Sequence, residues 1–529
     1  MYLLFPGRHQ LLTNFQFEYL HSIINNVSKS SDINGQPLKL DATVQAVIFA
    51  VTSANHSNTR RNPLPFYLRA LAIQEFAREF NVPVYVYGID DVGNLPNFAS
   101  YTLKTVKHES EGLFNLSPSN TAVVCSTPVL TMYEKLGFAI LPAELSDRKA
   151  WTYQHQLPWD LVEKIANDPE WGSKAEIVRD IHVSSRELWE KYRLDHKVRL
   201  LFKDTMIGDD GDITTTRDYN TYVRQMDEIA ELKYRETASH VRPGRIGDIG
   251  CAVGSWIKLA CNDERYRESD FYGIEVARHL YDICYQRKHN GEFANPFVFF
   301  LQRNAVTGLV FDANSMNTIH TSSLTHEIES YGSRNELLQF IRNRYQELAN
   351  GGIWINRDVV GPSDKEKIVL MKLTTADGRN DDYDKVHTGR KELRDYLAGL
   401  STYGRFLRFA QDFRKKEGYT LKHKILEREG EYYIQLTLQD ACEFMSRKDY
   451  IDNWQSEMHE TFCFWDFDEW KQHLEQAGFT IAPESKAYTN PWIVENRLRG
   501  KLELFEQTEN GLWQIEYPVT NMILLGEKR

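Results

Sequence analysis

The sequence predicts an α/β protein with two domains, each built around a parallel β-sheet. Short apolar runs typical of strands alternate with helical stretches in the first third of the chain and again in its second half. The length of 529 residues also exceeds what one hydrophobic core usually organises. We therefore expect one domain over residues 1–172, a helical and charged connector over 173–235, and a second domain over 236–529.

Composition and charge narrow the function classes. The net charge of −11 disfavours a nonspecific nucleic-acid binder, which needs a basic surface, although a local basic groove stays compatible with it. No apolar run reaches the length of a membrane span, and the apolar start is too short for a signal peptide. Six dispersed cysteines without a C-x-x-C pair indicate a reducing cytoplasm and no zinc site. We expect a cytoplasmic protein that binds no metal; its oligomeric state is left open.

The first domain should alternate strands with helices. A helix is predicted at residues 14–28. Asn62 and Pro63 are expected to open a second helix, because Asn caps a helix and Pro fits its first turn. A third helix, at 127–136, should end at Gly137. Strands are predicted at residues 2–5, 46–51, 84–87 and 122–125.

Three short motifs of this domain carry a family resemblance. They are FPGRHQ at residues 5–10, NPL at 62–64 with Arg69 after it, and STPVL at 126–130, which continues to Gly137. In this order they resemble the nucleotidyltransferases related to nicotinamide-nucleotide adenylyltransferase. The resemblance covers about residues 1–172 and implies a Rossmann-like, nucleotidyltransferase-like domain.

The histidine signature of that family is altered in this chain. Its H-x-G-H pattern falls at residues 13–16, which read TNFQ. In the family those histidines stabilise charge on the transferred phosphate, but Gln16 cannot offer an imidazolium. Phe15 replaces the glycine that lets the phosphate approach. We therefore expect a degenerate domain that binds a nucleotide or an RNA end, or serves as a scaffold; an active nucleotidyltransferase is the alternative.

The second domain opens with a glycine-rich turn between a strand and a helix. Residues 245–249 read as a strand, DIGCAVG follows at 248–254, and residues 255–260 read as a helix start. Such a turn brings backbone N–H groups close to a nucleotide-like ligand. Glycine is needed where a side chain would block the ligand or demand a forbidden φ.

Further strands follow in a matching order. The next strand, at 270–276, carries Glu275 at its tip, where a carboxylate can accept both hydroxyls of a ribose. After the strand at 297–301, Asn304 stands where a polar side chain could read an adenine edge. Two more apolar segments, near residues 311–320 and 353–358, continue the series.

This order of motifs resembles the class I S-adenosylmethionine-dependent methyltransferases, over about residues 215–362 and again near the C-terminus. The resemblance implies S-adenosylmethionine as cofactor and a Rossmann-like sheet. Ala252 replaces a frequent glycine and Asn304 a frequent aspartate. A dinucleotide-binding fold competes with this interpretation, but its G-x-G-x-x-G pattern is absent. The expected cofactor residues are Asp248, Gly250, Cys251, Ala252 and Gly254 at the turn, Glu275, Asn304, and Tyr219 and Tyr222 on a covering helix, where packing alone is the alternative role for the tyrosines.

The segment after the fourth strand supplies the candidate catalytic residues. Ligands of open α/β sheets sit beyond the carboxyl ends of the strands, so His320, His326 and Glu327 should lie near the transferred methyl group. A histidine titrating near neutral pH could take a proton from a hydroxyl or amine acceptor. The alternative is a histidine that only bonds the backbone.

A long insertion over 363–463 is expected at the rim of this site. Arg405, Arg408 and Arg414 interleave there with aromatic residues, which suits an anionic acceptor such as a phosphorylated metabolite or an RNA end. An amphipathic helix with a solvated face would show the same spacing. The domain should end with a helix over 467–479, a late loop at 488–492 near the substrate, and a strand at 522–526.

The function predicted from these features is methyl transfer from S-adenosylmethionine to an acceptor. Two alternatives remain open at this stage. A bifunctional enzyme would also transfer a nucleotidyl group with its first domain. A binding protein would use both domains as nucleotide sensors without turnover.

Overall fold

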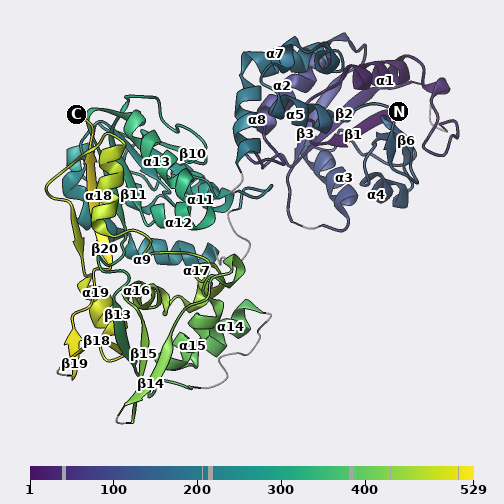
Figure 1. Ribbon diagram of the computed structural model, residues 1–529. Helices are drawn as coiled ribbons and strands as arrows, with labels where there is room; N and C mark the ends of the chain where they lie inside the picture. The colour runs from purple at the N-terminus through teal and green to yellow at the C-terminus, as the bar shows by residue number, and fades with distance from the viewer. Residues whose placement is uncertain are drawn as a thin grey trace. The chain divides into compact units, whose positions relative to one another are not determined.

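In a computed structural model the chain forms two compact units (Figure 1). The first comprises Met1–Asp204 with Asp209–Gly211, and the second Thr205–Gly208 with Asp212–Arg529. The expected connector is therefore divided between them. Among the described residues, no helix is both long and apolar enough to cross a membrane. The structure describes residues 1–38, 43–93, 95–204, 207–212, 219–380, 387, 389–428, 430–509 and 511–529, without the side chains of 219–222.

The first unit contains a five-stranded, all-parallel sheet, as the alternation of strands and helices predicted. Alternate residues of its second strand face opposite layers. Val47, Phe49 and Val51 join the core beneath one set of helices, while Ile48 and Ala50 join the core on the other face. The sheet order is β3 (Val84–Ile89), β2 (Ala46–Thr52), β1 (Tyr2–Gly7), β4 (Thr121–Val124), β5 (Ala139–Leu141).

Two groups of helices cover these faces. The chain orders them as α1 (Asn14–Asn25), α2 (Phe66–Phe76), α3 (Phe98–Glu109), α4 (Leu130–Lys135), α5 (Pro158–Asn167), α6 (Ala175–Val178), α7 (Val183–Lys191) and α8 (Leu194–Lys203).

One helix start of this unit was predicted wrongly. Helix α2 begins at Phe66, and Pro65, in extended backbone, precedes it. The Leu64 N–H donates to Gln10 Oε1 at 3.0 Å, and the Asn62 N–H donates to Thr59 Oγ1 at 3.0 Å. These bonds hold residues 62–64 outside the helix, although Asn62 and Pro63 have the residue types of a helix start.

The second unit contains a larger sheet with strand order β10-β9-β8-β11-β12-β20-β16, and β17 pairs with β20. Its first five strands are parallel and follow the 3-2-1-4-5 order of doubly wound sheets. In such a sheet the ligand crevice lies where the order reverses, here between β8 and β11. The strands are β8 (Arg245–Ile249), β9 (Asp270–Glu275), β10 (Val298–Gln302), β11 (Met316–Ser322), β12 (Leu348–Val359), β16 (Thr480–Ile481), β17 (Lys486–Tyr488) and the antiparallel β20 (Asn521–Glu527).

Helices cover both faces of this sheet. Trp354 of β12 packs into the core on one face, and its neighbours Ile353 and Ile355 pack into the core on the other. The predicted strands at 245–249 and 522–526 and the helix at 467–479 are thereby confirmed. The helices are α9 (Tyr219–Thr237), α10 (Ser255–Ala260), α11 (Arg278–His289), α12 (Thr325–Tyr331), α13 (Arg334–Glu347) and α18 (Phe467–Gln476).

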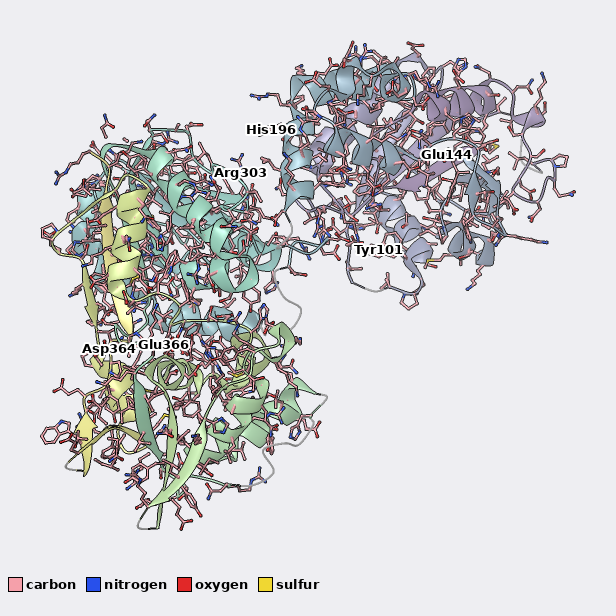
Figure 2. The ribbon with its side chains drawn as sticks, in the orientation of Figure 1. Tyr101, Glu144, His196, Arg303, Asp364 and Glu366 are labelled. Atoms are coloured by element: carbon pink, nitrogen blue, oxygen red, sulfur yellow. The ribbon has the colours of Figure 1, made fainter. Side chains whose placement is uncertain are left out.

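An added antiparallel sheet extends the second unit, and we call this part, residues 363–463 and 491–517, the added domain (Figure 1). Asp364 and Glu366, labelled in Figure 2, lie where the chain passes into it from β12. The expected insertion supplies three of the five strands, and the segment after residue 490 supplies the others. The sheet order is β14 (Lys424–Arg428), β15 (Glu431–Thr437), β13 (Ile368–Leu373), β18 (Leu502–Thr508), β19 (Gly511–Ile515), with helices α14 (Arg390–Ala398), α15 (Thr402–Asp412), α16 (Leu438–Arg447), α17 (Trp454–Glu457) and α19 (Pro491–Ile493).

Candidate active site

A cavity opens at the carboxyl ends of β8, β9, β10 and β11, and we call it the first cavity. It encloses about 1140 Å³, counting the space open to solvent. Gly254 is not among its lining residues, and the side chains of Tyr219 and Tyr222 lie outside the described residues. The structure brings the other predicted cofactor residues together here, along with two of the predicted catalytic residues: Asp248, Gly250, Cys251, Ala252, Glu275, Asn304, His320 and Glu327.

The turn from β8 to α10 needs left-handed backbone at three positions. Gly250, Ala252 and Gly254 have φ angles of 70°, 50° and 74°. The Gly250 N–H and Cys251 N–H both donate to the carbonyl of Ile274, which fixes the turn to β9. A Cβ on Gly254 would lie 3.1 Å from the Phe300 ring, so this glycine permits packing of the sheet and not approach of a ligand.

Glu275 ends β9 with a buried carboxylate that faces the first cavity. Its Oε2 accepts the Ala252 N–H at 2.9 Å, and its Oε1 accepts the N–H groups of Val276 and Ala277, both at 2.8 Å. Burial raises the pKa of Glu275 to about 7, and nearby Glu327 adds to the rise, while the three N–H donors oppose it. These three hydrogen bonds hold the carboxyl group in place. Because its pKa is about 7, two further hydrogen-bond donors from a ligand would shift the group toward its charged form.

Asp248 and His320 form a buried pair at the floor of this cavity. His320 Nδ1 lies 2.7 Å from Asp248 Oδ1, and the imidazole stacks on the Trp256 ring with centroids 4.2 Å apart. Among the described residues, the buried Nε2 of His320 has no hydrogen-bond partner. Since buried polar atoms are nearly always bonded, this nitrogen fits a polar group of a bound ligand.

The loop after β10 and the start of α11 form an apolar slot. Arg303, labelled in Figure 2, begins the loop. Asn304 Oδ1 accepts the Val306 N–H at 2.9 Å, so this side chain shapes its own loop at the slot. Apolar side chains also line the cavity here, and such a lining suits the ring of a heterocyclic ligand. They belong to Ala277, Leu280, Ala305 and Val306.

Helix α9 covers the first cavity, as the resemblance implied for the helix before the cofactor strand. Met226, Ala230 and Lys233 recur at helical spacing and line the cavity together. The helix is held to the glycine-rich turn because Asp227 accepts from Ser255 Oγ at 2.5 Å and pairs with Arg287 at 2.6 Å. Sequence reasoning missed Lys233; the one signal for it is a lysine within the apolar stripe of this helix.

His326 does not line the first cavity, and its surroundings contradict the expected role as a base. Its Nδ1 lies 2.6 Å from Asp358 Oδ1, and its Nε2 lies 3.5 Å from Glu460 Oε2. Burial alone would lower the pKa of His326, but these two carboxylates raise it well above its usual value. His326 pairing in turn lowers the pKa of Asp358 to about 2, against the effect of burial. The imidazole is therefore a buried cation and not a proton acceptor.

His326, Glu327 and Glu460 each offer one ligand atom, and these atoms lie within 4.8 Å of one another. A neutral imidazole with two carboxylates could hold a metal ion. The protonated imidazole already supplies positive charge between Asp358 and Glu460.

The charge on His326 predicts a fall in stability as pH rises. An unfolded histidine loses its proton near pH 6.5, while the folded group keeps it well above that value. Above about pH 6.5 the folded state therefore binds one more proton, and the free energy of unfolding falls by up to about 1.4 kcal/mol per pH unit. Denaturant unfolding between about pH 6.5 and 8.5 measures this slope.

The His326→Gln variant should lose that contribution to the slope. His473 is a matched control, because its pKa is lowered by burial and it carries no charge in this pH range. His473→Gln should keep the wild-type slope. Equal slopes in wild type and His326→Gln would show that the imidazole is neutral in the folded protein.

The three arginines that were expected to bind the acceptor do not line the first cavity. They do not line a second cavity beside it either. Arg405 donates to the carbonyl of Leu397 and lies 3.3 Å from Asp449. Arg408 pairs with Asp412 at 2.6 Å along α15. Arg414 lies at φ 49°, with its guanidinium over the Tyr419 ring. These side chains stabilise the added domain. The segment therefore matches the alternative interpretation, an amphipathic helix.

The first unit has a cavity of its own at the carboxyl ends of β1, β2 and β4. Thr13 caps α1, and Gln16 donates to Glu144 at 2.8 Å beside this cavity; Glu144 is labelled in Figure 2. Phe15 stacks on His155 with centroids 3.9 Å apart. Residues 13–16 thus build a helix cap, and the buried carboxylate of Glu144 adds negative charge where a phosphate would need positive charge.

No protein-family model matches the chain, and no curated protein matches it. Solved structures that match part of the chain were found. Geranyl diphosphate C-methyltransferase from Streptomyces coelicolor A3(2), solved with S-adenosyl-L-homocysteine, is 7% identical over 62% of this chain and 86% of its own, with a TM-score of 0.30. A putative S-adenosylmethionine-dependent methyltransferase from Listeria monocytogenes is 14% identical over 57% and 99%, with a TM-score of 0.28. The glycopeptide N-methyltransferase MtfA, also with S-adenosyl-L-homocysteine, is 9% identical over 56% and 86%, at 0.27.

Proposed function

We propose that the second unit is an S-adenosylmethionine-dependent methyltransferase. One observation carries this proposal. The glycine-rich turn, Asp248, the Glu275 carboxylate and the slot beside Asn304 come from successive strands and line one cavity. Their order matches the methionine, ribose and adenine parts of the cofactor, as the sequence resemblance implied. When bound, S-adenosylmethionine supplies an electrophilic methyl group on its sulfonium.

The chain's own residues would bind and orient this cofactor. Glu275 would accept the ribose hydroxyls, and the unpartnered Nε2 of His320 would bond a polar group near the turn. Met226 and Ala230 of helix α9 line the cavity and would exclude water from the bound cofactor. Catalysis would then rest mainly on holding the acceptor in line with the methyl group.

The pH dependence of S-adenosylhomocysteine binding tests the cofactor assignment. The ribose hydroxyls bond best to the ionised carboxylate of Glu275, whose pKa is raised to about 7. The affinity should therefore be nearly constant above pH 8 and fall about ten-fold between about pH 8 and 6 as the carboxylate is protonated. Isothermal titration calorimetry measures it.

Glu275→Gln should bind more weakly and lose the pH dependence, because its amide does not titrate in this range. Glu292, a half-buried glutamate of the same unit that pairs with Lys258, is a suitable control, and Glu292→Gln should behave as wild type. Absence of any binding heat for the wild type would refute the cofactor assignment itself.

For the first unit we favour a degenerate nucleotidyltransferase-like domain that does not transfer nucleotidyl groups. The cap formed by Thr13 and Gln16, the ring of Phe15 and the carboxylate of Glu144 support this interpretation. The bifunctional alternative would need a cationic group at residues 13–16, and the described side chains there offer none.

A further inference from the structure

A second cavity adjoins the first one beneath α9. It encloses about 910 Å³, counting the space open to solvent. Lys233 and Ser323 line both cavities, so the two spaces meet at these residues. Ser323 follows β11 with a φ of 56°, a strained backbone that is typical of functional sites.

The walls of the second cavity come from the methyltransferase sheet and from the added domain. α9 contributes Ile229 and Leu232, and β12 contributes Arg357 and Val359. The added domain and the loops that join it contribute mainly apolar and aromatic side chains. Among them are Met445, Phe462, Trp492, Ile493, Leu498 and Val519. Such a lining suits the apolar body of a small molecule.

Arg497 is the arginine of this cavity that holds no ion pair with a described residue. Its guanidinium lies over the rings of Tyr450 and Trp492, with centroid distances of 4.8 and 5.4 Å. Burial lowers the pKa of Arg497, while Tyr450, Asp449 and Glu457 raise it, and the Asp449 carboxylate is already bonded to Arg405 and Lys448. Stacking on two rings holds the guanidinium in place, and the in-plane donors that Tyr450 does not take suit an anion.

Arg357, in contrast, is already neutralised. Its Nε donates to Glu236 of α9 at 2.5 Å. The two arginines of the cavity therefore have different roles. Arg357 forms a structural ion pair, whereas the planar guanidinium of Arg497 can bind a carboxylate, a sulfonate or a phosphate.

Lys233 stands at the junction with a buried side chain, 9% exposed. No hydrogen bond or ion pair of its ammonium joins it to the described residues, whereas the buried Lys448 is bonded to Asp449 at 2.6 Å. The charged groups around Lys233 are Asp248 on β8, Glu327 on α12, and Arg357 and Asp358 on β12. Asp248, Arg357 and Asp358 are each paired with another side chain, to His320, Glu236 and His326 respectively.

We propose that the second cavity is the acceptor site, and that it takes a small amphipathic molecule with an apolar body and one anionic group. The anion binds Arg497, and a protonated oxygen or nitrogen of the acceptor lies beside Lys233. This inference rests on the methyltransferase function proposed above. A new bond joins that oxygen or nitrogen to the methyl carbon as the carbon–sulfur bond breaks and its electron pair stays on sulfur. The acceptor's proton passes to the neutral amine of Lys233, so atoms and charge balance.

An amphipathic dye tests the site without knowledge of the natural acceptor. Anilinonaphthalene sulfonate combines an aromatic body with one sulfonate, and its fluorescence rises in apolar surroundings. It would be titrated into the full-length protein saturated with S-adenosylhomocysteine, which keeps the dye out of the first cavity. Arg497→Met should weaken dye binding about 10- to 100-fold, as expected for loss of a charged hydrogen-bonded contact. Arg499→Met, a stem-matched variant of an exposed arginine that pairs with Glu495 and lines neither cavity, should leave it unchanged.

The outcomes separate this inference from the cofactor assignment. Equal dye affinity in wild type and Arg497→Met would overturn the acceptor site. A short RNA with a terminal phosphate that displaces the dye in an Arg497-dependent way would overturn the small-molecule class. Calorimetry with S-adenosylhomocysteine on the same samples reports on the first cavity alone. Arg497→Met should bind S-adenosylhomocysteine with wild-type affinity. If the wild type gives no binding heat, the cofactor assignment is rejected, and the dye titration still tests the second cavity.

Discussion

Substituting Gly250 by valine should remove S-adenosylhomocysteine binding. The residue has a φ of 70°, which costs an L-amino acid about 1–2 kcal/mol and a β-branched one more. A Cβ there would lie 3.0 Å from Leu324 Cδ1, and Leu324 lines the first cavity, so the added methyl groups push side chains into the space of the ligand. We expect the affinity to fall at least about 100-fold, or about 2.7 kcal/mol, in calorimetry.

Gly291→Val is the matched control for this prediction. Gly291 has a φ of 71°, and a Cβ there would meet no atom within 4 Å. The control therefore carries the same backbone strain in the same unit but leaves the cavity open. It should keep wild-type affinity, and its loss in thermal stability measures the cost of the backbone strain alone. Loss of binding in both would mean that strain alone, and not filling of the cavity, abolishes it.

Substituting Lys233 by methionine should lower methyl transfer about 10²- to 10⁴-fold, the range typical of a general base. Methionine keeps the length and apolar stem of the side chain but cannot accept a proton. Burial lowers the pKa of Lys233 to about 8, with Arg357 adding to the fall, while Asp248, Asp358 and Glu327 oppose it. Because the neutral amine is the active form, the wild-type rate should rise with pH to about 8 and then level off. Label from methyl-labelled S-adenosylmethionine, transferred to the small-molecule fraction of a cell extract, measures the rate.

Lys448 provides the control for this second prediction. Burial lowers its pKa to about 8 as well, yet it bonds Asp449 and lines neither cavity. Lys448→Met should lose stability and keep the pH profile of transfer. A Lys233→Met variant with wild-type rates and an unchanged pH profile would remove the lysine from the mechanism, whereas slow transfer with the wild-type profile would give it a purely structural role.

The parts that the sequence predicts correctly are those fixed by local chemistry. Buried runs such as the one that becomes β2 identify strands, because an all-apolar segment of this length suits a sheet covered on both faces. The turn at Gly250 and the acid at Glu275 are readable because their roles need particular residue types at fixed distances along the chain. Together they predict residues that the structure brings to one cavity.

The errors arise where distant segments decide the role of a residue. His326 has the residue type of a base, but Glu460, more than a hundred residues later, turns it into a buried cation. Arg405 and Arg408 lie in a suitable segment, yet acids of the added domain neutralise them. Arg497 goes unnoticed since only the folded added domain gives it aromatic neighbours at a cavity.

The pairing of β13 with β18 and of β12 with β20 has a consequence for synthesis. Leu370 pairs with Phe505, and Ile355 pairs with Leu525, so strands in both sheets of the second unit need partners made more than a hundred residues later. The long stretch of chain between two paired strands must close into a loop before these contacts form. Folds with contacts between such distant segments fold slowly. On the ribosome, the first unit, whose strands lie within residues 2–153, can be complete while the second still exposes unpaired edges of β12 and β13. The period until residues 502–527 emerge is then the one in which nascent chains are most prone to aggregate and most in need of a chaperone.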